Sequence, residues 1–111
     1  MDKLVNQSEV NYFLYRIEKN FPSFIAGVIT DRHGFPIASK ISKKLWVLEN
    51  TLALSAIVKK GGFIEDPHLV QIKRDLDKTK NYKLLVLLDK SKEYKSRLKP
   101  LKGLIKSQEL F

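Results

Sequence analysis

The sequence predicts an α+β domain with a single antiparallel sheet of four to five strands. Three observations carry this prediction. Apolar residues recur at helical spacing near the N-terminus, an extended segment with a tight turn follows over 24–39, and the apolar run YKLLVLL ends at Leu88. With 111 residues, of which 43% are hydrophobic, the chain has the size and composition of one domain, 1–111, with one core.

The first helix is predicted over Gln7–Asn20. Asn6, followed three residues later by Glu9, resembles a capping box, and Pro22 ends the helix because the residue before proline avoids the helical region. Five apolar side chains share one helical face: Val10, Phe13, Leu14, Ile17 and Phe21.

A β-hairpin is predicted next. Phe24–Thr30 is β-branched and apolar, residues 31–34 have turn chemistry, and Phe35–Ser39 resumes the strand. Gly27 should allow a close backbone or helix approach. Pro36 cannot donate to a ladder, so the second strand should start at a sheet edge or on a non-bonded side.

A long second helix is predicted from Ser42, as N-cap, to Lys60, where Gly61 and Gly62 stop it. It is apolar on nearly every side. One stripe, expected to pack on the sheet, contains Leu45, Leu48, Leu52 and Ala56. The far stripe contains Trp46, Val47, Leu54, Ile57 and Val58. A helix that is apolar all round must be buried all round, so the far stripe needs a cover. Another helix of the same chain is one candidate, and we favour a second subunit.

The second half contains two predicted strands, Leu69–Arg74 and Tyr82–Leu88, joined by a polar turn over 75–81. The apolar run of the later strand indicates a central position, buried on both faces. Phe63–Glu65 is a further short strand candidate. Near Ser91 or Lys92 a last helix should begin, and Pro100 and Gly103 predict that it is kinked or in two pieces. Its apolar face contains Tyr94, Leu98, Leu101, Leu104 and Ile105.

The net charge of +9 belongs mostly to the C-terminal half. Residues 57–111 carry 14 basic and 7 acidic residues, a net charge of +7, whereas residues 1–56 carry +2. The basic surface contains Lys92, Lys95, Arg97, Lys99, Lys102 and Lys106. A basic amphipathic helix fits an acidic protein or an anionic membrane, and fits nucleic acid less well because few aromatic residues are interleaved. An ordinary packed helix with a solvated lysine face explains the same pattern.

The chain has no cysteine, which excludes a disulfide framework and thiolate metal sites. No apolar run approaches the roughly 18 residues that span a bilayer, and the N-terminus lacks the apolar core of a signal peptide. We therefore expect a cytoplasmic protein.

Few residues offer chemistry. Asp31 and His33 would make an acid–imidazole pair, but no nucleophile motif accompanies them, and His68 adds no metal-ligand spacing. Asp75 and Asp77 are explained by turn chemistry, since a Ca²⁺ loop needs more oxygen ligands and a glycine. No catalytic residue, metal site or cofactor is predicted, and we expect a protein without enzyme activity.

The segment GVITDRHGFPIAS (27–39), followed by an apolar helix over 45–58, resembles the roadblock family of dynein light chain roadblock-like domains. The resemblance implies a roadblock/profilin-like fold. In it, one long helix covers one face of a five-stranded antiparallel sheet, and the N- and C-terminal helices cover the other. The stretch 69–88 is too short for three strands, which departs from the family's pattern. Either Phe63–Glu65 is the third strand of the sheet or one strand is missing.

The resemblance further implies a non-enzymatic scaffold that binds or regulates a small Ras-like GTPase. Such domains form dimers through the second helix and a neighbouring edge strand, so a homodimer or a heterodimer with another roadblock-like domain is expected. The interface residues would be Trp46, Asn50, Leu54, Ile57 and Val58, with Trp46 as the energetic anchor. The alternative, from another class, is a small basic domain that binds nucleic acid or an anionic membrane through its lysine-rich C-terminal half.

Overall fold

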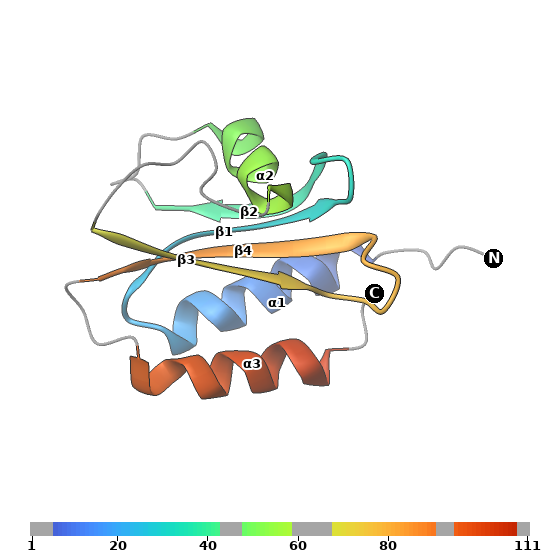
Figure 1. The fold of residues 1–111 in the computed structure, drawn as a ribbon. Helices are drawn as coiled ribbons and strands as arrows, with labels where there is room; N and C mark the ends of the chain where they lie inside the picture. The colour runs from blue at the N-terminus through green and yellow to red at the C-terminus, as the bar shows by residue number, and fades with distance from the viewer. Residues whose placement is uncertain (1–5, 43–47, 59–67, 91–94, 109–111) are drawn as a thin grey trace.

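The described residues form one antiparallel sheet and three α-helices (Figure 1). The computed structural model describes residues 6–42, 48–58, 68–90 and 95–108. Its strands are β1 (Phe24–Asp31), β2 (Pro36–Ile41), β3 (Leu69–Asp75) and β4 (Tyr82–Asp89), in the spatial order β2-β1-β4-β3. Its helices are α1 (Gln7–Asn20), α2 (Glu49–Ile57) and α3 (Leu98–Ser107), with a 3₁₀ turn, η1 (Lys95–Arg97), before α3. The predicted α+β class with a single antiparallel sheet is confirmed.

The sheet is covered on both faces, with α2 on one side and α1 and α3 on the other (Figure 1). Strand alternation sends Val28 and Leu85 toward α2, whereas Ile29 and Leu84 point toward α1 and α3. Two apolar cores therefore lie on opposite faces of the same four strands. No helix among the described residues is both long and apolar enough to cross a membrane.

Helix α1 has the predicted bounds. The Asn6 side-chain oxygen accepts a hydrogen bond from the Glu9 backbone N–H at 3.2 Å, which caps the helix as expected. Gly27 is buried beneath this helix: a Cβ atom there would lie 3.2 Å from the Phe24 ring and 3.4 Å from Leu14 Cδ2. The predicted close approach at Gly27 is thus confirmed.

The β1–β2 hairpin is held by its turn. The Asp31 carboxylate accepts hydrogen bonds from the backbone N–H groups of His33, at 2.8 Å, and Phe35, at 3.0 Å. Gly34 has a φ of +88°, a conformation that glycine adopts without strain. The β1–β2 register shifts near Pro36, and β2 is an edge strand of the described sheet, as its proline predicted.

Helix α2 is shorter than predicted. The described helix covers Glu49–Ile57, and Leu48 and Val58, which flank it, both have extended backbone angles. The other predicted helical residues, 43–47 and 59–60, and the predicted stop at Gly61 and Gly62 lie outside the described residues. Ser42 is not its N-cap: the Ser42 N–H donates to the Ile25 carbonyl and extends the sheet ladder. Leu48 is 77% exposed, so its assignment to the sheet-facing stripe was wrong.

Strands β3 and β4 match the predicted segments to within one residue. Strand β4 pairs with β1 on one side and β3 on the other, and five consecutive residues, Leu84–Leu88, are buried, which confirms its central position. The strand candidate Phe63–Glu65 lies outside the described residues.

The last helical segment begins as η1 and continues as α3, which runs through Pro100 and Gly103, so the division predicted at these residues is not found. The predicted start near Ser91 or Lys92 lies outside the described residues. Pro100 is the third residue of α3, where its missing N–H would have had no intrahelical partner, so it breaks no hydrogen bond. Leu101 and Ile105 are buried against the sheet, and Leu98 and Leu104 are half-buried.

Candidate interaction surfaces

The outer side of α2 carries an incompletely covered apolar surface. Leu54 is 41% exposed, and Phe35 at the hairpin is 68% exposed. Ile57 is half-buried beside Leu54. We call Phe35, Leu54 and Ile57 the α2–hairpin surface. Gly34, the residue before Phe35, lies against Leu54 and Ile57, and exposed apolar side chains in one region of a surface are candidates for a protein interface.

The hairpin itself supplies part of the cover that α2 needs. The turn rises beside α2 (Figure 1), and Gly34 is buried against it. A Cβ atom at position 34 would lie 2.9 Å from Leu54 Cδ2 and 3.2 Å from Ile57 Cδ1. The sequence pattern indicated a helix or a second subunit as the cover of α2, and did not indicate the turn.

The remaining predicted interface residues are distributed unevenly. Asn50 is exposed, and Val58 is half-buried just beyond the end of α2. Trp46, the predicted anchor, lies outside the described residues. The α2–hairpin surface therefore brings together two of the five predicted residues, Leu54 and Ile57, and adds Phe35.

Opposite the N-terminus of α2, strand β2 makes a second contact with the helix. The Ser39 hydroxyl donates a hydrogen bond of 2.6 Å to the Glu49 carboxylate. A negative side chain in the first turn also complements the helix dipole. This pair fixes the start of α2 over the edge strand, and so positions the α2–hairpin surface.

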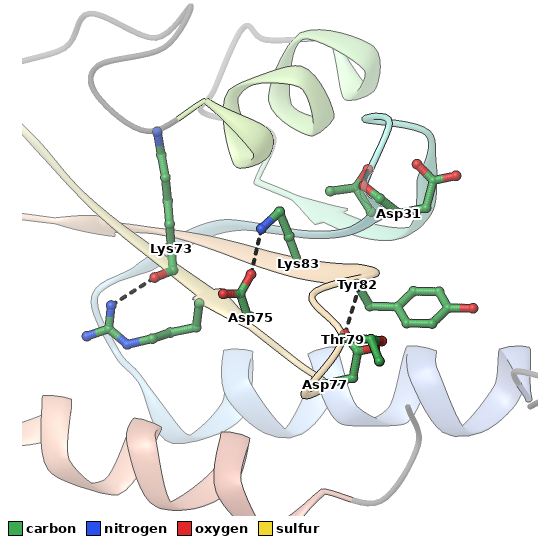
Figure 2. Close-up of polar contacts among 9 residues, drawn as sticks. Asp31, Lys73, Asp75, Asp77, Thr79, Tyr82 and Lys83 are labelled. Atoms are coloured by element: carbon green, nitrogen blue, oxygen red, sulfur yellow. Dashed lines mark hydrogen bonds and ion pairs between the residues drawn. The ribbon is translucent and has the colours of Figure 1, made fainter.

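Polar side chains gather where the end of α2 meets β3 and β4 (Figure 2). The Lys73 ammonium donates a hydrogen bond of 3.0 Å to the Val58 carbonyl, and Lys83 forms an ion pair of 2.6 Å with Asp75. A cavity of about 210 Å³ lies between these groups. Desolvation lowers the pKa of Lys73 below its usual value of 10.5.

These polar contacts have structural roles. Lys73 joins β3 to the end of α2, where a cation is favourable beside the last carbonyl groups. The Asp75–Lys83 pair bridges β3 to β4 at a position where the two residues are direct cross-strand partners. Three cations line the cavity, and each is engaged: Lys73 with the Val58 carbonyl, Lys83 with Asp75, and Arg74 with the Lys73 carbonyl at 2.8 Å. We therefore do not assign catalysis to it.

The other carboxylates considered from the sequence also organise turns. Asp77 accepts hydrogen bonds from the Tyr82 N–H, at 3.0 Å, and from the Thr79 hydroxyl (Figure 2). Asp31 is occupied by the hairpin backbone, and His33 is exposed beside Arg32. Among the described residues, no three His, Cys, Asp or Glu side chains are grouped so that they could hold a metal ion.

The predicted basic surface is partly described. Lys95, Lys99, Lys102 and Lys106 are all exposed, and Arg97 belongs to η1. Lys92 lies outside the described residues. These lysines lie on the sheet face opposite α2, so the basic surface and the α2–hairpin surface belong to different layers of the molecule (Figure 1).

Phe35, Glu49 and Lys73 were not predicted from the sequence as functional or positioning residues. An aromatic residue between a turn glycine and Pro36 was a signal for an exposed apolar side chain at the hairpin. No local pattern indicated Lys73, since its partner Val58 is 15 residues away in the chain.

Comparison with protein-family models, with curated proteins and with solved structures found no match for this chain.

Proposed function

We propose that this protein is a non-enzymatic, roadblock-like scaffold that dimerises through α2 and binds or regulates a small Ras-like GTPase. The observation that supports it best is the α2–hairpin surface, which leaves Leu54 and Phe35 41% and 68% exposed. Burial of apolar area at an interface contributes about 25 cal/mol per Å², so a second copy seated here would gain affinity from side chains that water now contacts.

The resemblance of residues 27–39 and 45–58 to roadblock domains gives the proposal its GTPase partner. The hairpin followed by a helix over one sheet face is compatible with this resemblance. A scaffold of this kind needs rigid surfaces rather than reactive groups, in agreement with the structural roles of Asp31, Asp77 and Lys73.

The first test is the solution mass by light scattering, for the wild type and for Leu54→Glu. We expect a wild-type dimer at about 100 μM and a monomer for the variant, because the dimer would bury an unpaired carboxylate. Glutamate is a good helix former, so the fold of α2 should survive, and circular dichroism checks this.

Tyr12→Glu is the matched control, since Tyr12 is 61% exposed on α1, and α1 lies on the face of the sheet opposite α2 (Figure 1). Its mass should equal that of the wild type. A wild-type monomer, or a dimer that Leu54→Glu leaves intact, would contradict dimerisation through this surface.

The partner is tested separately by calorimetric titration with purified small Ras-like GTPases, each loaded with GDP or with a non-hydrolysable GTP analogue. We expect saturable binding to at least one of them with a preference for one nucleotide state. A dimer that binds none of a representative panel at about 100 μM would contradict the GTPase assignment and leave dimerisation standing.

A further inference from the structure

A row of four lysines runs along the outer side of the last helical segment. Lys99, Lys102 and Lys106 are spaced i, i+3 and i+7 in α3, and Lys95 in η1 precedes Lys99 by four residues. At about 100° per residue the three helical positions fall within roughly 60° of one another. We call these four residues the lysine row. All four are exposed.

The lysine row has no acidic neighbours in its own segment. Residues 95–108 contain no Asp or Glu, and the nearest acidic residues in the sequence, Glu93 and Glu109, lie outside the described residues. The two ion pairs between described side chains, Glu18–Lys40 and Asp75–Lys83, involve no residue of this segment. Like charges three or four residues apart on a helix repel each other. An anionic partner would relieve that repulsion.

The apolar side of α3 is already used by the fold. Leu101 and Ile105 are buried against the sheet, and residues 95–108 contain no aromatic side chain. A partner therefore meets charge on the lysine row, with neither an inserting apolar face nor a platform for stacked bases. Gly103, in the exposed part of α3, adds no side chain, and a Cβ atom there would meet nothing within 4 Å.

A small cavity next to the row indicates the chemistry of the partner. About 140 Å³ of space lies between β3 and α3, lined by Arg74 and Lys102 and by the apolar side chains of Val70, Ile72 and Leu98. Arg74 and Lys102 thus add cations beside the row that suit the anionic headgroup of a phospholipid. A nucleic acid also presents phosphates, but residues 95–108 contain no aromatic side chain on which its bases could stack.

We propose that the lysine row and Arg74 form a peripheral docking surface for a bilayer that contains anionic phospholipids. Laterally mobile headgroups adapt to the spacing of the lysines, and a bilayer offers a broad surface to a straight row. Binding is electrostatic and reversible, so it requires anionic lipid and weakens as salt screens the charges. The proposal is independent of dimerisation, because the lysine row lies on the sheet face opposite α2.

The test is co-sedimentation with phosphatidylcholine vesicles, with and without about 30% phosphatidylserine. We expect binding only to the anionic vesicles at about 50 mM salt, and a steep decrease at about 300 mM. Each lysine near an anionic surface contributes roughly 1 kcal/mol, which is about a fivefold change in partitioning. The double variant Lys99→Gln/Lys102→Gln should therefore bind about 25-fold more weakly.

The matched control is Lys19→Gln/Arg32→Gln, which removes the same charge from exposed positions on α1 and on the hairpin. It should keep most of the binding, and both double variants should keep the wild-type circular dichroism spectrum. Three results would overturn the proposal: no binding of the wild type to anionic vesicles at low salt, an equal loss in both double variants, or tight binding of a single-stranded or duplex oligonucleotide by a protein that ignores the vesicles.

Discussion

The ammonium group of Lys73 lies 3.0 Å from the backbone oxygen of Val58, the first residue after α2. The contact joins an edge strand of the described sheet to the end of the helix that carries the α2–hairpin surface. It also takes a charged group partly out of water, which lowers the pKa of Lys73 below 10.5.

The stability of the protein should depend on Lys73 in alkaline solution. With its pKa lowered on folding, Lys73 binds fewer protons in the folded than in the unfolded state between its folded pKa and 10.5. The contribution of Lys73 to the free energy of unfolding is fully present above pH 10.5, the unfolded pKa. It is lost as the pH falls through the lower pKa of the folded state. The free energy difference between the wild type and Lys73→Met should therefore rise as the pH increases from about 8 toward 10.5.

Urea unfolding of the two proteins across this pH range measures the difference. Titration of the other lysines is common to both proteins and cancels. A difference that stays flat or decreases with rising pH would show that folding does not lower the pKa of Lys73.

Two glycines should respond to alanine with opposite signs. Gly34→Ala should lower the free energy of unfolding by about 1–2 kcal/mol or more, because φ is +88° there and a Cβ would lie 2.9 Å from Leu54 Cδ2. Gly103→Ala should raise it by about 0.5–1 kcal/mol, because alanine favours the exposed α3 position and meets nothing within 4 Å. Thermal and urea unfolding of both variants check the signs, and equal signs would mean that the turn or α3 differs from this description.

The Ser39–Glu49 hydrogen bond should appear as a coupling energy. We expect about 0.5–1.5 kcal/mol from a double-mutant cycle of Ser39→Ala, Glu49→Ala and both together, because the 2.6 Å contact uses an ionised acceptor. Unfolding in urea at neutral pH gives the four free energies. Additivity within about 0.3 kcal/mol would indicate that β2 does not hold the start of α2.

The stability of the protein should depend on the buried side chains of α3 and not on its exposed lysines. Leu101 is 1% exposed, so Leu101→Ala should cost about 2–4 kcal/mol through lost burial and a cavity. Lys99→Ala should change the stability by no more than about 0.5 kcal/mol, since Lys99 is exposed. Denaturant unfolding of both variants tests this. A large loss in Lys99→Ala would mean that the lysine row is a structural element.

Much of the fold could be predicted from local patterns. Three patterns depend only on residues that are close together in the sequence: the helical periodicity before Asn20, the turn residues after Thr30 and the apolar run before Asp89. The structure places the corresponding elements as expected. The α2–hairpin surface was predicted less well. Leu54 was assigned from the sequence to the outer side of the helix, whereas the exposed side chain of Phe35 was not predicted.

The sequence by itself determined the class of the fold, the hairpin, the central position of β4 and the basic character of α3, since each follows from short-range periodicity, turn propensity or charge. Only the tertiary structure decided where α2 begins and ends and which of its sides remain exposed. A segment that is apolar in every direction has no preferred face, so its burial depends on the sheet below it and on the turn at Gly34 beside it. The Lys73–Val58 contact has the same origin: it joins groups that only the folded chain brings together.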